Sequence, residues 1–344
     1  MAFKKMGVGL LVFVLLMIAG CSNSNESSSA ESAGSDSKET VNIDFSLFPS
    51  ENDMFSVYFR DWAKQIEEET DGRVTITPYY SGQLSSLFET LDSVRNGTVD
   101  GGLLSAGAIS GDIASMGLLE VFGVFQNGED FRGFYDESGE FLHQIFQDNG
   151  VQLSMWTTGG NQFLFLDQDE FLKSPDQFDG LKFRTAGKWQ AEQVEELGAT
   201  PLTLDPGELY LALQNRTVDT TAQTVNLTEA FKLYEVAPKL SLAKLALNAN
   251  FFVFNPDVWS KISEEDQETI QNISKEMGMN SYEFFIEKEN EILENIQNNG
   301  AELYTLTDEE HAVLLDKFQA VIPEIAESVG DEGKELHEIL KKYQ

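Results

Sequence analysis

The chain has 344 residues, of which 23 are Lys or Arg and 58 are Asp or Glu, so its formal net charge is −35. A content of 41% hydrophobic and 24% charged residues is typical of a folded globular protein, and the length allows two domains of roughly 100–200 residues each. The acidic excess argues against nucleic-acid binding, since there is no basic surface to displace counterions. The single Cys excludes an intrachain disulfide and a Cys-rich zinc site.

The first 20 residues are predicted to be a lipoprotein signal peptide. A basic pair, Lys4–Lys5, precedes the apolar run Gly7–Ile18, which is too short for a bilayer span of about 20 residues. The small residues Ala19–Gly20 then precede Cys21 in the order of a bacterial lipobox, in which the Cys is acylated after cleavage. We therefore expect Cys21 to be the lipidated residue; an ordinary signal peptide with a chance Cys is the alternative.

The segment 21–40 is predicted to be a flexible tether, because it is Ser-rich, poor in apolar residues and without periodicity. It would hold the folded part, from Val41 onward, on the extracytoplasmic face of the cell membrane, at the cell surface or in the periplasm. The acidity of an exported chain indicates high external salt or pH, since about 1 M salt shortens the Debye length to roughly 3 Å and screens self-repulsion. A merely acidic surface is the alternative.

Strand and helix patterns alternate from Val41 onward. We predict a strand over 41–48, a helix carrying Phe55 to Ile66, a strand over 74–79, a helix over 84–95 and a strand over 99–104. This alternation predicts an α/β fold with a mostly parallel sheet.

One pattern occurs twice. The segment 96–100, Asn-Gly-Thr-Val-Asp, returns at 215–219 as Asn-Arg-Thr-Val-Asp, and each copy follows a strand-like stretch, a glycine and a predicted helix. Two copies predict two lobes of related topology; a chance echo is the alternative.

A long helix is predicted near the C-terminus. A capping box at Ser263 opens an apolar pattern that runs to Gly300, about 36 residues or roughly 54 Å, unless Met277–Met279 breaks it. An unbroken helix of this length must pack along both lobes. A second capping box at Thr307 opens another helix, and Pro323 opens one more.

Catalytic and metal-binding motifs are missing from the sequence. The three His residues, His143, His311 and His337, lie in charged helical stretches and are interpreted as solvated surface residues. The sequence contains no His-Glu-x-x-His, Gly-x-Ser-x-Gly, Gly-x-Gly-x-x-Gly or Walker motif. We therefore expect no enzyme activity, no metal and no cofactor.

Arg184 is the residue that most favours a ligand site. It lies in a short strand that enters the glycine loop at Gly187, and ligands of α/β sheets bind at the carboxyl ends of the strands. Guanidinium binds a carboxylate in a bidentate manner that Lys cannot copy. A salt bridge to one of the many carboxylates is the alternative.

Several ordered motifs resemble those of a known family, the extracytoplasmic solute-binding proteins of TRAP (tripartite ATP-independent periplasmic) transporters. The resemblance runs from about Ile43 to about Ile262. It is carried by Gly82–Leu84, Asn96–Asp100, Gly180–Thr185, Glu196–Pro201, Glu208–Gln214, Val218–Asp219 and Tyr234–Ala237.

This resemblance implies a two-lobed periplasmic-binding-protein-like α/β fold with hinge strands and a long bracing helix. We expect lobe I to comprise 41–160 plus about 249–290, and lobe II to comprise 161–248 plus about 291–344. The ligand is expected in the cleft between the lobes, which close over it.

The resemblance also implies roles for individual residues. Most family members bind organic acids, and their carboxylate-binding Arg corresponds to Arg184. A polar pocket position corresponds to Gln223, and the first-lobe loop corresponds to Pro49–Asn52, with Glu51 and Asn52 as substrate-binding candidates.

The chain departs from the family pattern in the hinge strand, where Asn161 or Gln162 stands in place of a frequent Arg, and at Thr220, where a Gly is usual. Asn161 and Gln162 are still expected to be substrate-binding residues. A clamp made of two Arg residues is therefore not expected. Trp189 and Phe163 are expected to supply an apolar or aromatic wall, with core packing as the alternative for Trp189. A monocarboxylate with an apolar or ring body, or a zwitterion such as ectoine, fits these changes.

The predicted function is that of an extracytoplasmic solute receptor. It captures a small organic acid between two lobes and delivers it to the membrane subunits of a TRAP transporter, as a lipid-anchored monomer without nucleic-acid partners. Two alternatives remain: a receptor for an ATP-driven importer or a sensor kinase, and a surface enzyme such as a hydrolase.

Overall fold

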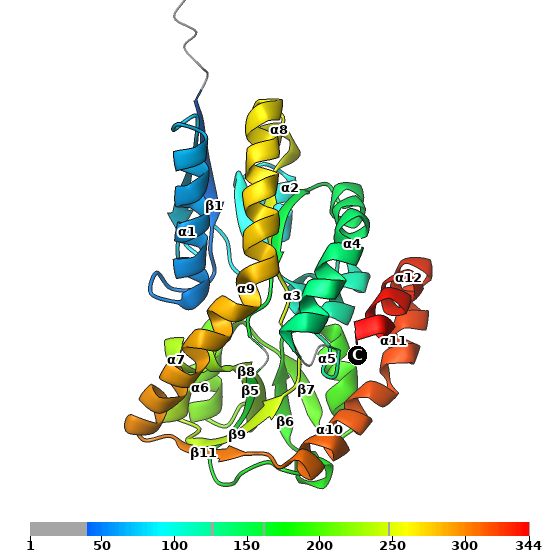
Figure 1. Cartoon of the computed structure of the whole chain (residues 1–344). Coiled ribbons are helices and arrows are strands. Elements are labelled where there is room, and N and C mark those ends of the chain that lie inside the picture. Colours follow the sequence, from blue (N-terminus) through cyan, green and yellow to red (C-terminus); the bar gives the residue numbers. More distant parts are fainter. Residues whose placement is uncertain (1–39, 125–126, 161, 247, 344) are drawn as a thin grey trace, which may run out of the picture. The chain divides into compact units, whose positions relative to one another are not determined.

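Two β-sheets organise the computed structural model, which describes residues 40–124, 127–160, 162–246 and 248–343, with Gln162 described by its backbone alone (Figure 1). The five-stranded sheet has the order β2-β1-β3-β10-β4 and the six-stranded sheet the order β11-β9-β5-β8-β6-β7. Residues Glu39–Gln344 form one compact unit. The α/β class and the two-lobed arrangement are thus confirmed.

The first lobe is built around the five-stranded sheet. Its elements are β1 (Val41–Ser46), α1 (Met54–Glu69), β2 (Val74–Tyr79), α2 (Thr90–Arg95), β3 (Gly101–Ser105), α3 (Ala106–Ile109), η1 (Ala114–Leu119), α4 (Gly128–Asp148), β4 (Gln152–Thr157), β10 (Asn250–Phe254) and α8 (Pro256–Trp259).

The second lobe is built around the six-stranded sheet. Its elements are β5 (Gln162–Asp167), η2 (Pro175–Phe178), β6 (Lys182–Thr185), α5 (Lys188–Glu195), β7 (Thr200–Thr203), η3 (Pro206–Glu208), α6 (Leu209–Gln214), β8 (Thr220–Thr224), α7 (Val225–Ala230), η4 (Leu233–Glu235), β9 (Lys239–Lys244), β11 (Glu302–Thr305) and α10 (Asp308–Ala320).

Both sheets mix strand directions. The strands of the strand–helix–strand units run parallel, as β1 does with β2 and β3, and β6 with β7 and β8. The strands that receive the chain after it crosses between lobes, β5 and β10, pair antiparallel with both of their neighbours. A crossing strand enters its sheet from the side of the other lobe, so it runs against the strands already there.

The repeated Asn-x-Thr-Val-Asp motif has the same local structure in both lobes. Asn96 Oδ1 accepts from the backbone N–H of Thr98 at 2.9 Å, and Asn215 Oδ1 accepts from that of Thr217 at 2.9 Å. The closing Asp of each copy accepts from the adjacent parallel strand at 2.9 Å, from Asp44 in lobe I and from Lys182 in lobe II. The repeat therefore sets the start of β3 and β8 against their neighbouring strands.

The predicted helix over 84–95 is shorter than expected, since only Thr90–Arg95 is helical. Before it, Ser85 Oγ lies 3.0 Å from Ser46 Oγ and 2.9 Å from Thr90 Oγ1. Such side-chain hydrogen bonds compete with the helical backbone pattern. These hydroxyls therefore anchor the segment to β1 instead.

The long helix α9 (Glu264–Asn298) is continuous through Gly278. It contacts α1, α4 and β4 in lobe I and α7 in lobe II, so it runs along both lobes as predicted (Figure 1). Its first turn is fixed by Ser263, whose side chain accepts from Asp266 N–H, and by Arg73, which donates to the Asp266 carboxylate at 2.6 Å.

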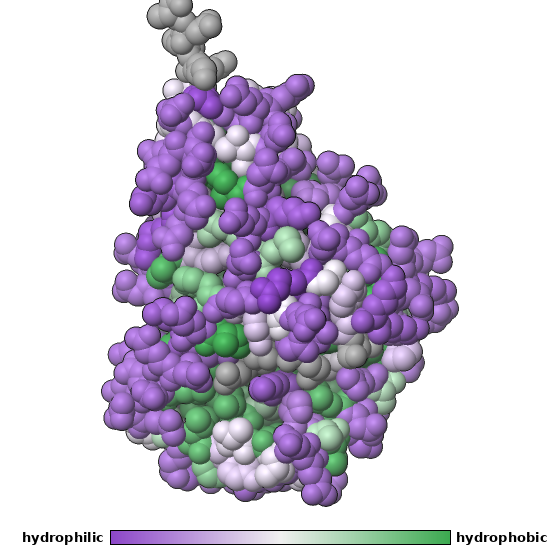
Figure 2. Space-filling model, viewed as in Figure 1, coloured by the Kyte–Doolittle hydropathy of each residue, from purple (hydrophilic) through white to green (hydrophobic). Residues whose placement is uncertain are grey.

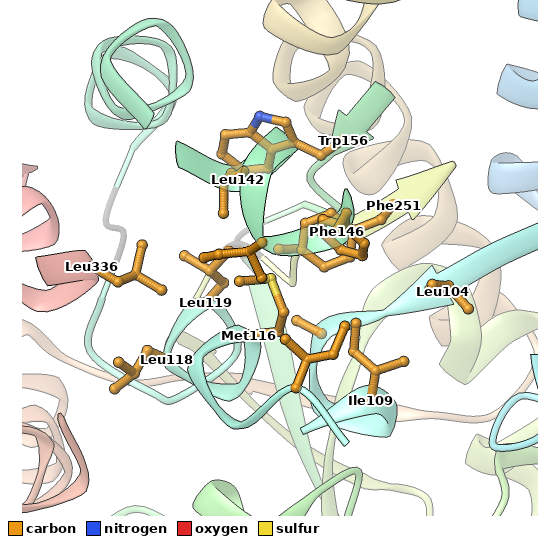
Figure 3. Packing of buried hydrophobic residues seen from close by; sticks show 14 of the residues in the cluster. Leu104, Ile109, Met116, Leu118, Leu119, Leu142, Phe146, Trp156, Phe251 and Leu336 are labelled. Atoms are coloured by element: carbon orange, nitrogen blue, oxygen red, sulfur yellow. The ribbon is translucent and has the colours of Figure 1, made fainter. Parts of the chain in front are cut away.

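The chain end returns to the first lobe. Helices α11 (Ile322–Val329) and α12 (Asp331–Leu340), followed by η5 (Lys341–Tyr343), contact η1 and α4, and Figure 3 shows Leu336 beside Leu118 and Leu119. Residues 322–343 thus pack with lobe I, although the sequence assigned them to lobe II. Apolar surface on η1 and α4 explains this placement, because burying it against these helices is favourable.

The visible surface is mostly hydrophilic, with scattered apolar residues (Figure 2). This agrees with the acidic composition. Within the described residues, no helix is both long and apolar enough to cross a membrane.

Candidate functional site

The candidate site lies where the two lobes meet, at the carboxyl ends of β6 and β8. Arg184 in β6 pairs with Thr221 in β8 and Leu202 in β7. Successive side chains of a strand point to opposite faces, so Phe183 enters the apolar cluster of lobe II and Arg184 faces the other way.

The Arg184 side chain is only 3% exposed. Its Nε and Nη2 donate to the carbonyl of Leu204 at 2.9 and 2.7 Å, which fixes one edge of the guanidinium. Burial lowers the pKa of Arg184 to about 10, so the group stays charged at neutral pH. The contacts of the described residues leave the edge formed by Nη1 and Nη2 for a ligand, and a carboxylate is the matching acceptor.

A buried acid, Glu120, faces Arg184 from lobe I. It caps the end of η1, is 4% exposed and accepts weakly from Ser105 Oγ at 3.4 Å. Among the described residues the Glu120 and Arg184 side chains form no direct ion pair within 4.0 Å, but they interact through space. Burial raises the pKa of Glu120 to about 8, even though the positive charge of Arg184 acts to lower it. Glu120 is therefore largely neutral at pH 7, and the Arg184 charge is available to a bound anion.

Three buried amides near the lobe boundary lack hydrogen-bond partners among the described residues. They are Gln223 through Nε2, Asn226 through both side-chain atoms and Asn248 through Oδ1. Gln223 is the last residue but one of β8, Asn226 is the second residue of α7 and Asn248 precedes β10. Buried polar atoms are normally satisfied, so a polar solute at this boundary would supply what the protein does not.

A cavity of about 290 Å³ lies between the first-lobe loop and α7. It is lined by Ser50, Asn52, Asp53, Met54, Asn226, Glu229, Ala230 and Ile292. Burial raises the pKa of Asp53 to about 7, and the Glu229 carboxylate adds to this effect. Of the two loop residues expected to bind substrate, Asn52 lines the cavity, whereas Glu51 is exposed and is not part of its lining.

The two expected aromatic wall residues lie in the apolar clusters. Trp189 is 3% exposed, packs with the lobe I cluster and donates from Nε1 to the Ala114 carbonyl at 2.8 Å. Phe163 packs with the lobe II cluster, its ring 5.9 Å from that of Phe122. Protein atoms surround both rings, so the alternative, core packing, describes Trp189 better than a ligand wall.

Two other expected site residues and the lipidation residue cannot be placed. Asn161 and Cys21 lie outside the described residues, and the side chain of Gln162 is not described. The described backbone just before Asn161 belongs to the segment that crosses between the lobes. There, Gly159 N–H donates to the Asn248 carbonyl at 2.9 Å. This bond ties the two strand crossings between the lobes to each other.

The lobes make direct contact through α5. An added Cβ at Gly187 would lie 2.2 Å from the Gly107 carbonyl oxygen, so the two backbones approach as only glycine allows. Gln190 Nε2 donates to the Glu120 carbonyl at 3.1 Å, and Gln193 binds both backbone groups of Phe122. These contacts join α5 of lobe II to the segment 107–122 of lobe I.

Sequence reasoning missed Glu120, Asn226, Asn248 and Asp53. Glu120 carried a usable signal, because it is the one acidic residue within the apolar run 116–125. The interpretation of His337 as a solvated residue was wrong, since it is buried at 7% exposure on the side of α12 that packs on lobe I. In the described part of the chain, no group of three or more His, Cys, Asp or Glu residues is placed to hold a metal ion.

Comparison with known proteins concerns most of the folded part of the chain. Residues 45–328 match the family model DctP, described as bacterial extracellular solute-binding protein, family 7. The ectoine-binding periplasmic protein TeaA of Halomonas elongata is 26% identical over 293 residues, covering 83% of this chain and 85% of that protein. The 2,3-diketo-L-gulonate-binding periplasmic protein YiaO of Escherichia coli is 23% identical over 267 residues, 77% of this chain and 81% of that protein.

Solved structures share the fold. A TRAP periplasmic solute-binding protein from Desulfovibrio salexigens superposes with a TM-score of 0.83 at 21% identity, covering 88% of this chain and 98% of that one. Because the family model spans most of the folded part, the chain belongs to the DctP family of bacterial extracellular solute-binding proteins, family 7.

Proposed function

We propose that this protein is a receptor that captures a small carboxylate-containing solute between its lobes and delivers it to the membrane subunits of a TRAP transporter. The observation that carries this proposal is the buried, charged Arg184, which has one guanidinium edge left for an anion. The amides of Gln223 and Asn248 would hold the polar groups of the same solute.

The relatives support an acidic or zwitterionic solute. Related structures hold orotic acid, succinate and pyroglutamic acid, and TeaA is described as ectoine-binding. One guanidinium opposite a largely neutral Glu120 suits a solute with one carboxylate better than one with two. The family consists of solute-binding receptors, and the proposal assigns no catalytic step to this chain.

The anchoring of the receptor is also part of the proposal. Cleavage before Cys21 and acylation of its sulfur would place the folded part outside the cytoplasmic membrane, next to the transporter. Intact-mass measurement of the protein from its own membranes, compared with Cys21→Ser, tests this. A lipid-sized mass increment that is lost in the variant is expected, whereas an unlipidated mature chain would contradict it.

Calorimetric titration tests the binding proposal. The purified folded part is titrated with ectoine, pyroglutamate, orotate, succinate and glucuronate, and Arg184→Lys is compared with the exposed control Arg216→Lys, whose side chain pairs with Asp169 at 3.0 Å. We expect R184K to weaken binding by about 2–5 kcal/mol, because a buried charged hydrogen bond is lost, while R216K leaves it unchanged.

Two outcomes would contradict the proposal. If none of these solutes, and no metabolite co-purifying with the native protein, binds, the receptor function falls. If R184K binds as tightly as the parent protein, Arg184 is not the carboxylate site.

A further inference from the structure

The cavity between the first-lobe loop and α7 is a second feature of the lobe boundary, here called the α1–α7 cavity. Its lining comes from Ser50–Met54 of lobe I, from Asn226, Glu229 and Ala230 of lobe II, and from Ile292 of α9. An occupant would therefore touch both lobes and the bracing helix at once.

The lining of the α1–α7 cavity is acidic and polar. It contains two carboxyl groups, Asp53 and Glu229, two amides and one hydroxyl, and none of its eight residues is basic. Such oxygen-rich surroundings are suited to a cation and unsuited to the anion expected at Arg184.

Two of its side chains are buried and have polar atoms left unsatisfied by the described part of the chain. Asp53 is 3% exposed; its Oδ1 accepts from Phe55 N–H at 2.8 Å, whereas its Oδ2 has no partner among those residues. Asn226 is 5% exposed, and neither its Oδ1 nor its Nδ2 finds a partner there. Two buried acceptor oxygens of residues that line this cavity, Asp53 Oδ2 and Asn226 Oδ1, thus have no partner in the described part of the chain, and both are of the kind that binds a cation.

We infer that the α1–α7 cavity binds a small monovalent cation between Asp53 of lobe I and Asn226 and Glu229 of lobe II. The charge class follows from the ligand set, since two carboxyl groups, one of them with a raised pKa, and one amide oxygen offer little negative charge. The cation is either a free alkali-metal ion or the ammonium-type end of the captured solute. The second source rests on the proposed receptor function; the first does not.

The role of such a cation is to favour lobe closure. Asp53 and Glu229 line the same cavity from opposite lobes, and the Glu229 carboxylate disfavours the charged form of Asp53. A cation between them turns this repulsion into an attraction that exists only when the lobes are together. The receptor would then bind a cation in the α1–α7 cavity and an anion at Arg184, two separate sites between the lobes.

The test uses the double variant Asp53→Asn, Glu229→Gln. Asn is a good N-cap residue, so D53N keeps the cap of α1, and the amide oxygen introduced by E229Q can still accept the hydrogen bond that Asn295 donates to Glu229. The control is Glu309→Gln, which removes one negative charge from an exposed position on α10.

Thermal unfolding is measured in sodium chloride and in N-methylglucamine chloride at equal ionic strength, without solute. A bound free ion predicts a Tm about 3 °C higher in sodium for the parent and E309Q, and no difference for the double variant. Solute affinity is measured in parallel. A cation carried by the solute predicts no sodium effect, but an ectoine affinity at least about tenfold lower in the double variant, with pyroglutamate affinity unchanged.

If the double variant alters neither the sodium response nor the ectoine-to-pyroglutamate ratio, the cation site is refuted, and the receptor proposal stands as long as a solute still binds. If no solute binds but the double variant abolishes a sodium response, the receptor proposal fails and the cation site stands.

Discussion

Replacing Glu120 by Gln should change how stability depends on pH. Burial raises the pKa of Glu120 from 4.5 to about 8, so between these values the folded state holds a proton that the unfolded state has released. In this range the free energy of unfolding therefore falls by about 1.4 kcal/mol for each unit by which the pH rises. The neutral amide introduced by E120Q would mimic the protonated acid and remove this loss.

From pH 5 to pH 7 we expect the free energy of unfolding of E120Q to rise by about 2–3 kcal/mol relative to that of the parent protein. The free energy of unfolding is measured by urea titration of the solute-free protein, followed by circular dichroism at pH 5, 6 and 7. Asp53 also has a raised pKa, so the parent alone does not isolate Glu120; the difference between parent and variant does.

The control for this measurement is E309Q, which should show no pH-dependent difference because Glu309 is exposed. A stability difference between E120Q and the parent that stays constant from pH 5 to pH 7 would refute the reasoning. It would mean that Glu120 is ionised in the fold and neutralises Arg184 directly.

Two further changes probe the contact between the lobes. Gly187→Ala would place a Cβ 2.2 Å from the Gly107 carbonyl oxygen and so push the lobes apart. Small-angle scattering should then report a larger radius of gyration, and calorimetry a weaker solute affinity. If neither value changes, the contact is not needed for lobe closure. Gln193→Ala should lower the free energy of unfolding by about 1–3 kcal/mol, because it leaves the buried backbone groups of Phe122 unpaired, and a urea titration indistinguishable from that of the parent would contradict this.

Features encoded in short stretches of sequence were predictable. The strands at 41–48 and 74–79, the repeated Asn-x-Thr-Val-Asp turns and the capped helix starting after Ser263 each depend on neighbours within a few residues. The resemblance of ordered motifs then identified the family. These parts needed no knowledge of long-range contacts.

The composition of the site was less predictable, because it depends on which segments meet in three dimensions. Arg184 and Gln223 were expected there, and the structure places both as buried residues at strand ends. Glu120 and Asn248 come from a short 3-10 helix and a crossing segment whose positions only the tertiary fold decides. Trp189 has the sequence pattern of either a wall or a core residue, and its surroundings, such as the Ala114 carbonyl to which it donates, follow from the tertiary fold alone.

The central claim is that a carboxylate binds the open edge of Arg184 between the lobes. A crystal structure of the protein with the solute that co-purifies from its native host, identified by mass spectrometry, tests it most directly. The account predicts an unaltered solute whose carboxylate lies within hydrogen-bond distance of Nη1 and Nη2. A solute bound elsewhere, with the Arg184 guanidinium paired to the Glu120 carboxylate, would contradict it.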